Sequence, residues 1–193
     1  NARKTFDSGY ILDAIIEYEK ITTTFSDNAI VFYNLGLVYK VNEEYDFAVL
    51  NYKKAKELNP FENKYSKAIT TIAQEMTRDG DTEYRRQEFD SAIEKYNRAI
   101  QYSSTYTIAL FKLARTYFKM NDYENARIIL EKNLAVDPLQ EQTEKMLGDI
   151  YRSTSNTEKA IEHYNSAINI NGNYYRAYYS LGTTLLSEGK LTE

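Results

Sequence analysis

Residues 29–62 read AIVFYNLGLVYKVNEEYDFAVLNYKKAKELNPFE, and this stretch decides the fold. Apolar and small residues occupy positions 4, 7, 8, 11, 20, 24, 27 and 32 of it, namely Phe32, Leu35, Gly36, Tyr39, Ala48, Tyr52, Ala55 and Pro60. That spacing describes one antiparallel pair of helices, whose apolar face is too large for a single pair to bury. Much of the pattern recurs downstream, so we expect neighbouring pairs to stack on one another.

The same register divides the chain into repeated units. Complete units cover residues 29–62, 73–106, 107–140 and 141–174, partial units cover residues 1–28 and 175–193, and residues 63–72 are inserted between two units. Position 8, where the helices of a pair come close together, holds Gly36, Ala114 and Gly148, because a larger side chain would push the helices apart. Pro60 and Pro138, the only prolines, both fall at position 32, where a helix must end.

The inserted residues 63–72 contain no Gly or Pro and continue directly into residues 73–76. They are therefore interpreted as extra turns on a helix that extends toward Gly80 and changes the superhelix pitch. A flexible joint between the units before and after the insertion is the alternative, since the run Asp79-Gly80-Asp81 can break a helix. The sequence leaves both interpretations open.

The repeated pattern resembles the tetratricopeptide repeat family over nearly the whole chain. The resemblance implies an all-α fold, a single right-handed superhelical solenoid of stacked antiparallel helix pairs. It also implies a non-catalytic scaffold that binds proteins or peptides, a role with many unrelated partners in this family. Two residues depart from the pattern: Asn133 replaces a small residue at position 27, and Asp79 replaces an apolar residue at position 7.

In this family, the first helix of each unit lines a concave groove through positions 2, 5, 6, 9, 12 and 13. Carried over to this chain, the predicted partner-binding residues are Arg78, Tyr84, Arg85, Phe111, Lys112, Arg115, Phe118, Lys119, Lys145, Arg152, Arg176 and Tyr179, with Asp81 and Asp149 as opposing charges. Cations interleaved with aromatic residues favour an acidic peptide segment of a partner, although the whole chain has a net charge of −4. The alternative is a solvated helix face whose long side chains cover apolar surface.

The carboxylate clamp of the chaperone-docking members of this family is matched at only two places. Asn34 and Arg78 stand at clamp positions, and the insertion separates them. We therefore do not expect a chaperone C-terminal tail to be the ligand.

The residue inventory argues against an enzyme. The chain has no cysteine, His163 is its only histidine, and no Gly-rich phosphate loop or Gly-x-Ser-x-Gly elbow is present. Nucleophilic catalysis and metal or cofactor binding therefore lack the residues they need. Nucleic acid is disfavoured as a partner by the negative net charge and by the absence of a base-reading module.

The localisation remains unknown from the sequence. No apolar run is long enough to cross a membrane, so we expect a soluble segment. The cytoplasm is slightly favoured. The absence of an initiating Met and the incomplete terminal units suggest a fragment or a processed form, which leaves a periplasmic or anchored protein open.

A structural subunit is the alternative function. If the chain ends at Glu193, Leu181, Leu185 and Leu186 in the last partial unit would lack the second helix that normally covers such residues, and a longer chain would remove this argument. Tyr174, Tyr175, Tyr178 and Tyr179 gather on the same segment. Because exposed apolar surface favours association, the solenoid ends or the convex face would join copies or partners, and a homo-oligomer remains open.

Overall fold

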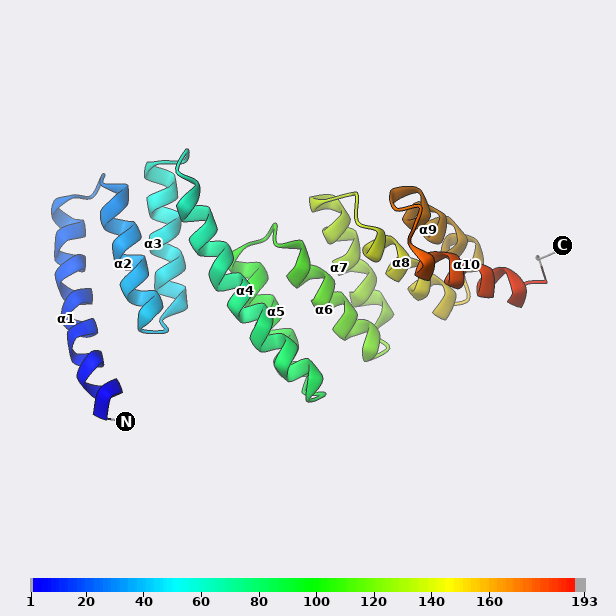
Figure 1. Cartoon of the computed structure of the whole chain (residues 1–193), viewed down its shortest axis with the longest axis horizontal. Helices are drawn as coiled ribbons and strands as arrows, with labels where there is room; N and C mark the ends of the chain where they lie inside the picture. Colours follow the sequence, from blue (N-terminus) through cyan, green and yellow to red (C-terminus); the bar gives the residue numbers. More distant parts are fainter. Residues whose placement is uncertain (1, 190–193) are drawn as a thin grey trace. The chain divides into compact units, whose positions relative to one another are not determined.

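The computed structural model describes residues 2–189, with side chains from residue 10 onward, and these residues form ten α-helices (Figure 1). The helices are α1 (Ala2–Thr24), α2 (Ala29–Val41), α3 (Tyr45–Leu58), α4 (Asn63–Arg85), α5 (Phe89–Tyr102), α6 (Thr107–Lys119), α7 (Tyr123–Val136), α8 (Glu141–Ser153), α9 (Thr157–Ile170) and α10 (Tyr175–Ser187). Residue 1 and residues 190–193, which the register assigns to the partial terminal units, lie outside the described residues. The predicted all-α fold is confirmed.

Helices that follow one another in the chain pack as antiparallel neighbours. α2 packs on α3, α6 on α7 and α8 on α9, and these pairs lie within the predicted units 29–62, 107–140 and 141–174. The chain divides into two compact units, residues 1–75 and 76–193, and their boundary falls inside α4. Within residues 1–75, α1 is a single 23-residue helix that packs on α2.

The inserted residues 63–72 form the first part of α4, which is 23 residues long where α2 has 13 and α3 has 14. α4 also runs through Asp79, Gly80 and Asp81 without interruption. This run therefore does not end the helix, and the helical conformation continues to Arg85.

The turn inside each helix pair has one recurring backbone feature. Position 15 of the register adopts a positive φ of 60° to 65° at Glu43, Gln87, Asn121, Ser155 and Gly189. This left-handed conformation ends the first helix and lets the chain reverse into the second. Only the last of these residues is a glycine, so the repeated backbone conformation has no glycine signal in the sequence.

A steric pairing explains the small residue at position 8. In three units the tyrosine at position 24 lies directly against a glycine of the first helix. A Cβ added to the glycine would lie 2.5 Å from a ring carbon in the pair Gly36–Tyr52, 2.7 Å in Gly80–Tyr96 and 2.5 Å in Gly148–Tyr164. Real Cβ atoms do not approach a ring carbon so closely, so only glycine permits this helix separation.

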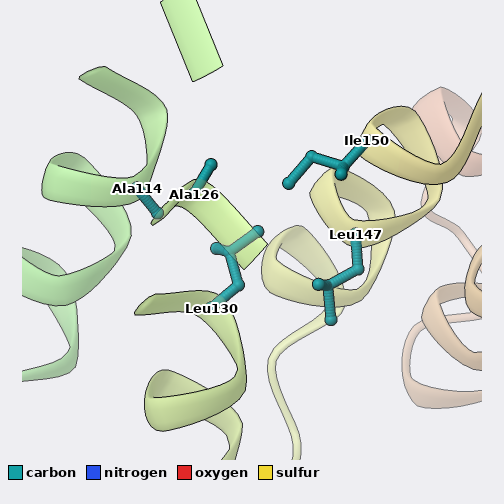
Figure 2. Packing of buried hydrophobic residues seen from close by; sticks show 5 residues of the cluster. All are labelled: Ala114, Ala126, Leu130, Leu147 and Ile150. Atoms are coloured by element: carbon teal, nitrogen blue, oxygen red, sulfur yellow. The ribbon is translucent and has the colours of Figure 1, made fainter. Parts of the chain in front are cut away.

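The unit 107–140 fills the same space with aliphatic side chains. Ala114, Ala126, Leu130, Leu147 and Ile150 form a buried cluster that joins α6, α7 and α8 (Figure 2). Leu130 is fully buried in it. Full burial of such a side chain contributes about 1.5–3 kcal/mol, so the contact between one pair and the next is a main source of stability.

Replacing Gly148 by alanine should destabilise the fold by about 1–3 kcal/mol, because the new methyl group overlaps the ring of Tyr164. Gly182→Ala is the matched control, since Gly182 occupies position 8 of α10 and a Cβ there would meet no atom within 4 Å. The control should stabilise the helix by about 0.5–1 kcal/mol. Urea unfolding followed by circular dichroism measures both, and equal effects would contradict the steric explanation.

Candidate functional site

One face of α6 forms a wall of a cavity of about 490 Å³. The cavity is lined by Thr107, Ile108, Phe111, Lys112 and Arg115 of α6, by Asp137 and Gln140 of the loop after α7, and by Glu141 and Gln142 of α8. Phe111, Lys112 and Arg115 belong to the predicted partner-binding residues, and their spacing along α6 places them on one face. A volume of this size is typical of ligand pockets, which span roughly 300–1,000 Å³.

Lys112 is already engaged in an ion pair. Its Nζ lies 2.5 Å from Oδ2 of Asp81, and the other oxygen of Asp81 accepts a hydrogen bond of 2.9 Å from the Tyr96 hydroxyl. Burial, followed by the hydrogen bond to Asp81, raises the pKa of the Tyr96 hydroxyl, which therefore stays protonated. Asp81 therefore accepts the hydrogen bond of the buried Tyr96 hydroxyl and also neutralises Lys112, a predicted groove residue.

A similar arrangement recurs on α8, where the lysine comes from the same helix as the aspartate. Lys145 Nζ lies 2.6 Å from Oδ2 of Asp149, and the Tyr164 hydroxyl donates to Oδ1 of Asp149 over 3.0 Å. Burial first, and then the charge of Asp149, raises the pKa of the Tyr164 hydroxyl. Aspartate at position 9 and tyrosine at position 24 thus form a repeated hydrogen bond inside the helix pair. The sequence analysis treated both aspartates only as opposing charges and missed this role.

Arg115 has a different environment. Its guanidinium lies over the ring of Tyr84, 4.6 Å from the ring centroid. Its Nε is buried without a hydrogen-bond partner, and none of the ion pairs among the described residues involves Arg115. Stacking holds the guanidinium while its charge remains unpaired. The prediction of Tyr84 and Arg115 as site residues thus corresponds to two side chains in contact.

A polar network shapes the wall opposite α6. The fully buried Asn133 donates from Nδ2 to Thr143 over 3.1 Å and to Gln140 over 3.3 Å. Gln140 in turn donates to Asp137 over 3.2 Å. Asn133 therefore fixes the start of α8 and the preceding loop, which explains why a polar residue replaces the usual small one. The register assigns no groove position to this loop, so Asp137 and Gln140 were not predicted. Gln142 occupies position 2, which is a groove position, so the register could have predicted it.

The other predicted residues lie on α4, α6, α8 and α10 and do not line this cavity. Arg85 donates to Thr82 over 3.2 Å, Arg152 to Thr183 over 3.3 Å and Arg176 to Tyr175 over 3.2 Å, while the ring of Phe118 lies 5.5 Å from that of Tyr123. Arg78 and Lys119 are exposed, and Tyr179 is 73% exposed. The structure thus brings together Tyr84, Phe111, Lys112 and Arg115, and distributes the remaining residues along the helices.

His163 makes packing contacts. Its Nδ1 lies 2.7 Å from a carboxylate oxygen of Glu144, and its ring stacks on Tyr151 with 5.2 Å between centroids. Within residues 2–189, no cluster of three or more His, Cys, Asp or Glu side chains has a geometry that would hold a metal ion. None of the helices in this range combines the length and the apolar character needed to cross a membrane.

Models of one protein family match several parts of the chain. A TPR repeat model matches residues 80–127 and 148–189, and a tetratricopeptide repeat model matches residues 29–61, which together make up more than half of the sequence. The chain belongs to the tetratricopeptide repeat family. This TPR chain is therefore a protein–protein interaction domain of a scaffold family whose members are typically non-catalytic.

A curated relative of this TPR chain is anaphase-promoting complex subunit 3 of Schizosaccharomyces pombe. The two sequences are 28% identical over 180 residues, which cover 87% of this chain and 26% of the relative. The TPR chain thus spans about a quarter of the length of the relative it matches.

Solved TPR structures share the fold. The first TPR domain of Spaghetti (RPAP3), bound to the HSP90 peptide SRMEEVD, has a TM-score of 0.59 at 15% identity, covering 62% of this chain and 95% of its own. MamA has a TM-score of 0.52 at 22% identity and covers 90% and 95%. The Sgt2 TPR domain of Aspergillus fumigatus has a TM-score of 0.58 at 23% identity and covers 61% and 80%. At these identities the likeness concerns the fold alone.

Replacing Asp81 by alanine should lower the stability of this TPR chain by about 1–3 kcal/mol, because the buried Tyr96 hydroxyl loses its acceptor. Asp79→Ala is the control, since Asp79 is exposed on the same helix, and its effect should stay within about 0.5 kcal/mol. Asp81→Asn retains an oxygen acceptor and should be milder than the alanine variant. Chemical denaturation compares the three, and a silent Asp81→Ala variant would refute the role of the carboxylate.

Proposed function

We propose that this TPR chain binds an acidic peptide segment of a partner protein, with the cavity beside α6 as the central subsite. The observation that carries the proposal is the guanidinium of Arg115, which belongs to the cavity lining and has no ion-pair partner within the described part of the chain. Unpaired cations that are partly removed from water are costly, and a ligand carboxylate would relieve this cost.

The surroundings of Arg115 suit a carboxylate. The Tyr84 ring holds the planar guanidinium in place, so little side-chain entropy is lost when a ligand binds. A guanidinium binds a carboxylate through two parallel hydrogen bonds, which gives direction as well as energy. Lys112 is a weaker candidate, because Asp81 already neutralises it.

Apolar contact area lies next to the charge. Ile108 is 50% exposed, and Phe111 is partly buried against the core cluster while it also lines the cavity. An apolar side chain of the peptide placed on these two residues would supply the buried anchor that typical hot spots have. The proposed ligand therefore combines a carboxylate with an apolar or aromatic neighbour.

The remaining predicted cations would act at the rim. These cations would attract an acidic chain and change the association rate and the salt dependence of binding more than the final affinity. They are Arg78, Arg85, Lys119, Arg152 and Arg176, while Lys145 would contribute less because Asp149 neutralises it. Tyr179 would add contact area. The HSP90 peptide bound by the structural neighbour is not the proposed ligand. Of the clamp residues this chain keeps only Asn34, in the compact unit 1–75, and Arg78, in the unit 76–193.

Panning a phage-displayed random peptide library against the immobilised chain should enrich sequences with Asp or Glu beside an apolar residue. Arg115→Ala should weaken the selected peptides at least about tenfold, since a hydrogen-bonded charge pair is lost. Phe111→Ala should weaken them as well. Arg127→Ala is the matched control, because Arg127 lies on α7 and pairs with Glu124 and Glu131 outside this cavity. Neutral or basic selected sequences, or equal binding by Arg115→Ala, would contradict the proposal.

A structural subunit is the second candidate, favoured by the surface of α10. Tyr175, Tyr178, Tyr179 and Leu186 are 69%, 50%, 73% and 65% exposed, whereas Leu181 and Leu185 are only partly exposed. Large exposed apolar groups on one helix are typical of association surfaces. The curated relative is named as a subunit of a complex, which supports a structural-subunit function for this chain.

If α10 mediates self-association, sedimentation velocity should show a mass that rises with protein concentration. Replacing Tyr178 and Leu186 by serine should shift the equilibrium toward the monomer, because both exposed side chains lose apolar area. The double variant Leu12→Ser and Ile16→Ser is the control, since these side chains are 52% and 50% exposed on α1. A wild-type chain that stays monomeric at high concentration would contradict self-association.

A further inference from the structure

The repeated Tyr–Asp–Lys cluster has an incomplete third copy. In the unit 73–106 and in the unit 141–174, a buried tyrosine at position 24 donates to an aspartate at position 9, and this aspartate pairs with a lysine. In the unit 29–62, Tyr52 occupies position 24 and its ring lies against Gly36 in the same way. Position 9, however, is Leu37, whose side chain accepts no hydrogen bond.

The Tyr52 hydroxyl therefore has no acceptor. Tyr52 is fully buried, and its hydroxyl has no hydrogen-bond partner within the described residues. Burial, followed by the electrostatic effects of Tyr33 and Glu75, raises the pKa of Tyr52 to about 12, so the hydroxyl keeps its proton at neutral pH and remains a donor. A buried donor without an acceptor is rare in folded proteins and disfavours the structure that contains it.

Tyr52 belongs to the lining of a cavity of about 240 Å³ within residues 1–75. The other lining residues are Tyr33, Leu37, Lys40, Lys64, Lys67, Ala68 and Thr71. Lys64, Lys67, Ala68 and Thr71 come from the inserted residues 63–72, so the insertion supplies one wall and two of the three lysines. This cavity shares no residue with the cavity beside α6.

The lysines of this cavity are only partly neutralised. Lys40 pairs with Glu75 at 2.8 Å, and Lys64 lies at the longer distance of 3.7 Å from Glu62. The Lys64 ammonium also lies over the rings of Tyr33 and Tyr65, at 5.3 and 5.4 Å from their centroids. Lys67 is exposed and takes part in none of the ion pairs found among residues 10–189. The cavity thus has an excess of positive charge beside a buried hydroxyl donor.

We propose that this cavity is a second binding site, for an aspartate or glutamate side chain of an acidic peptide. The ligand carboxylate takes the place of the missing position 9 aspartate, accepts the hydrogen bond of Tyr52 and pairs with Lys64 and Lys67. Because the Tyr52 hydroxyl is buried, a lining side chain moves aside during binding, and we expect this to be Leu37, which lines the same cavity and is 39% exposed. The volume accommodates one side chain, which favours an extended peptide over a folded partner.

The site is tested with a fluorescein-labelled hexaglutamate peptide, titrated by fluorescence anisotropy into the full chain carrying Arg115→Ala. This background removes the guanidinium of the cavity beside α6, so a failure of that proposed site does not affect the result. Adding Tyr52→Phe should weaken binding about tenfold, because only the donating hydroxyl is lost. The matched control Tyr164→Phe should leave the affinity within about twofold, since that hydroxyl is already bonded to Asp149 and its unit lies outside residues 1–75.

A second variant places a carboxylate of the chain itself in the site. Leu37→Asp restores position 9 to the residue found in the two complete clusters, so it should abolish hexaglutamate binding in the same background. It should also raise the midpoint of thermal unfolding by about 2–4 °C, because the Tyr52 hydroxyl gains an acceptor. No binding of hexaglutamate in the Arg115→Ala background, equal binding of a hexaglutamine peptide, or unchanged binding after Tyr52→Phe would each overturn the proposal.

Discussion

The contact between a tyrosine ring and a glycine inside a helix pair is the constraint on which the rest of the structure depends. It sets how closely the two helices approach, because no side chain larger than hydrogen fits between Gly36 and Tyr52 or between Gly148 and Tyr164. The ring spans the interface and carries its hydroxyl to the first helix, where Asp149 accepts the hydrogen bond of Tyr164 at position 9. In this family the same position faces the groove. A packing requirement in the core is therefore met by a residue on the proposed binding surface.

Because of this hydrogen bond, part of the positive charge predicted for the groove is neutralised. Lys112 and Lys145 both contribute to a basic pattern in the sequence, but each is neutralised by an aspartate that a buried tyrosine holds in place. Arg115 forms no such ion pair, and its guanidinium stacks on the ring of Tyr84. The availability of a cation for a ligand thus depends on the second helix of a pair as much as on the first.

The sequence predicted the fold because the fold depends on spacing and side-chain volume, which a single chain displays directly. The glycine and tyrosine positions, the helical nature of residues 63–72 and the family were all visible in this way. The positive φ at Glu43 or Ser155 was not, because neither residue type signals a left-handed conformation. The groove register included Phe111 and Arg115, and both line the cavity beside α6 because their direction follows from helical periodicity. The wall formed by Asp137 and Gln140 was missed, since it depends on a loop fixed by hydrogen bonds to the buried Asn133 and Thr143.

Position 9 alternates along the chain between aspartate and other residues, and this alternation decides where the protein itself lacks a carboxylate. It is Leu37 in the unit 29–62, Asp81 in the next, Arg115 in the unit 107–140 and Asp149 in the unit 141–174. Where it is aspartate, the acceptor for the buried tyrosine belongs to the protein. In the other two units the protein has no carboxylate at this position. In the unit 29–62, the Tyr52 hydroxyl has no acceptor within the described residues. In the unit 107–140, Leu130 replaces the tyrosine, and Arg115 has no ion-pair partner within the described residues. A carboxylate supplied by a ligand would correct each of these two deficits, each within its own compact unit of the chain.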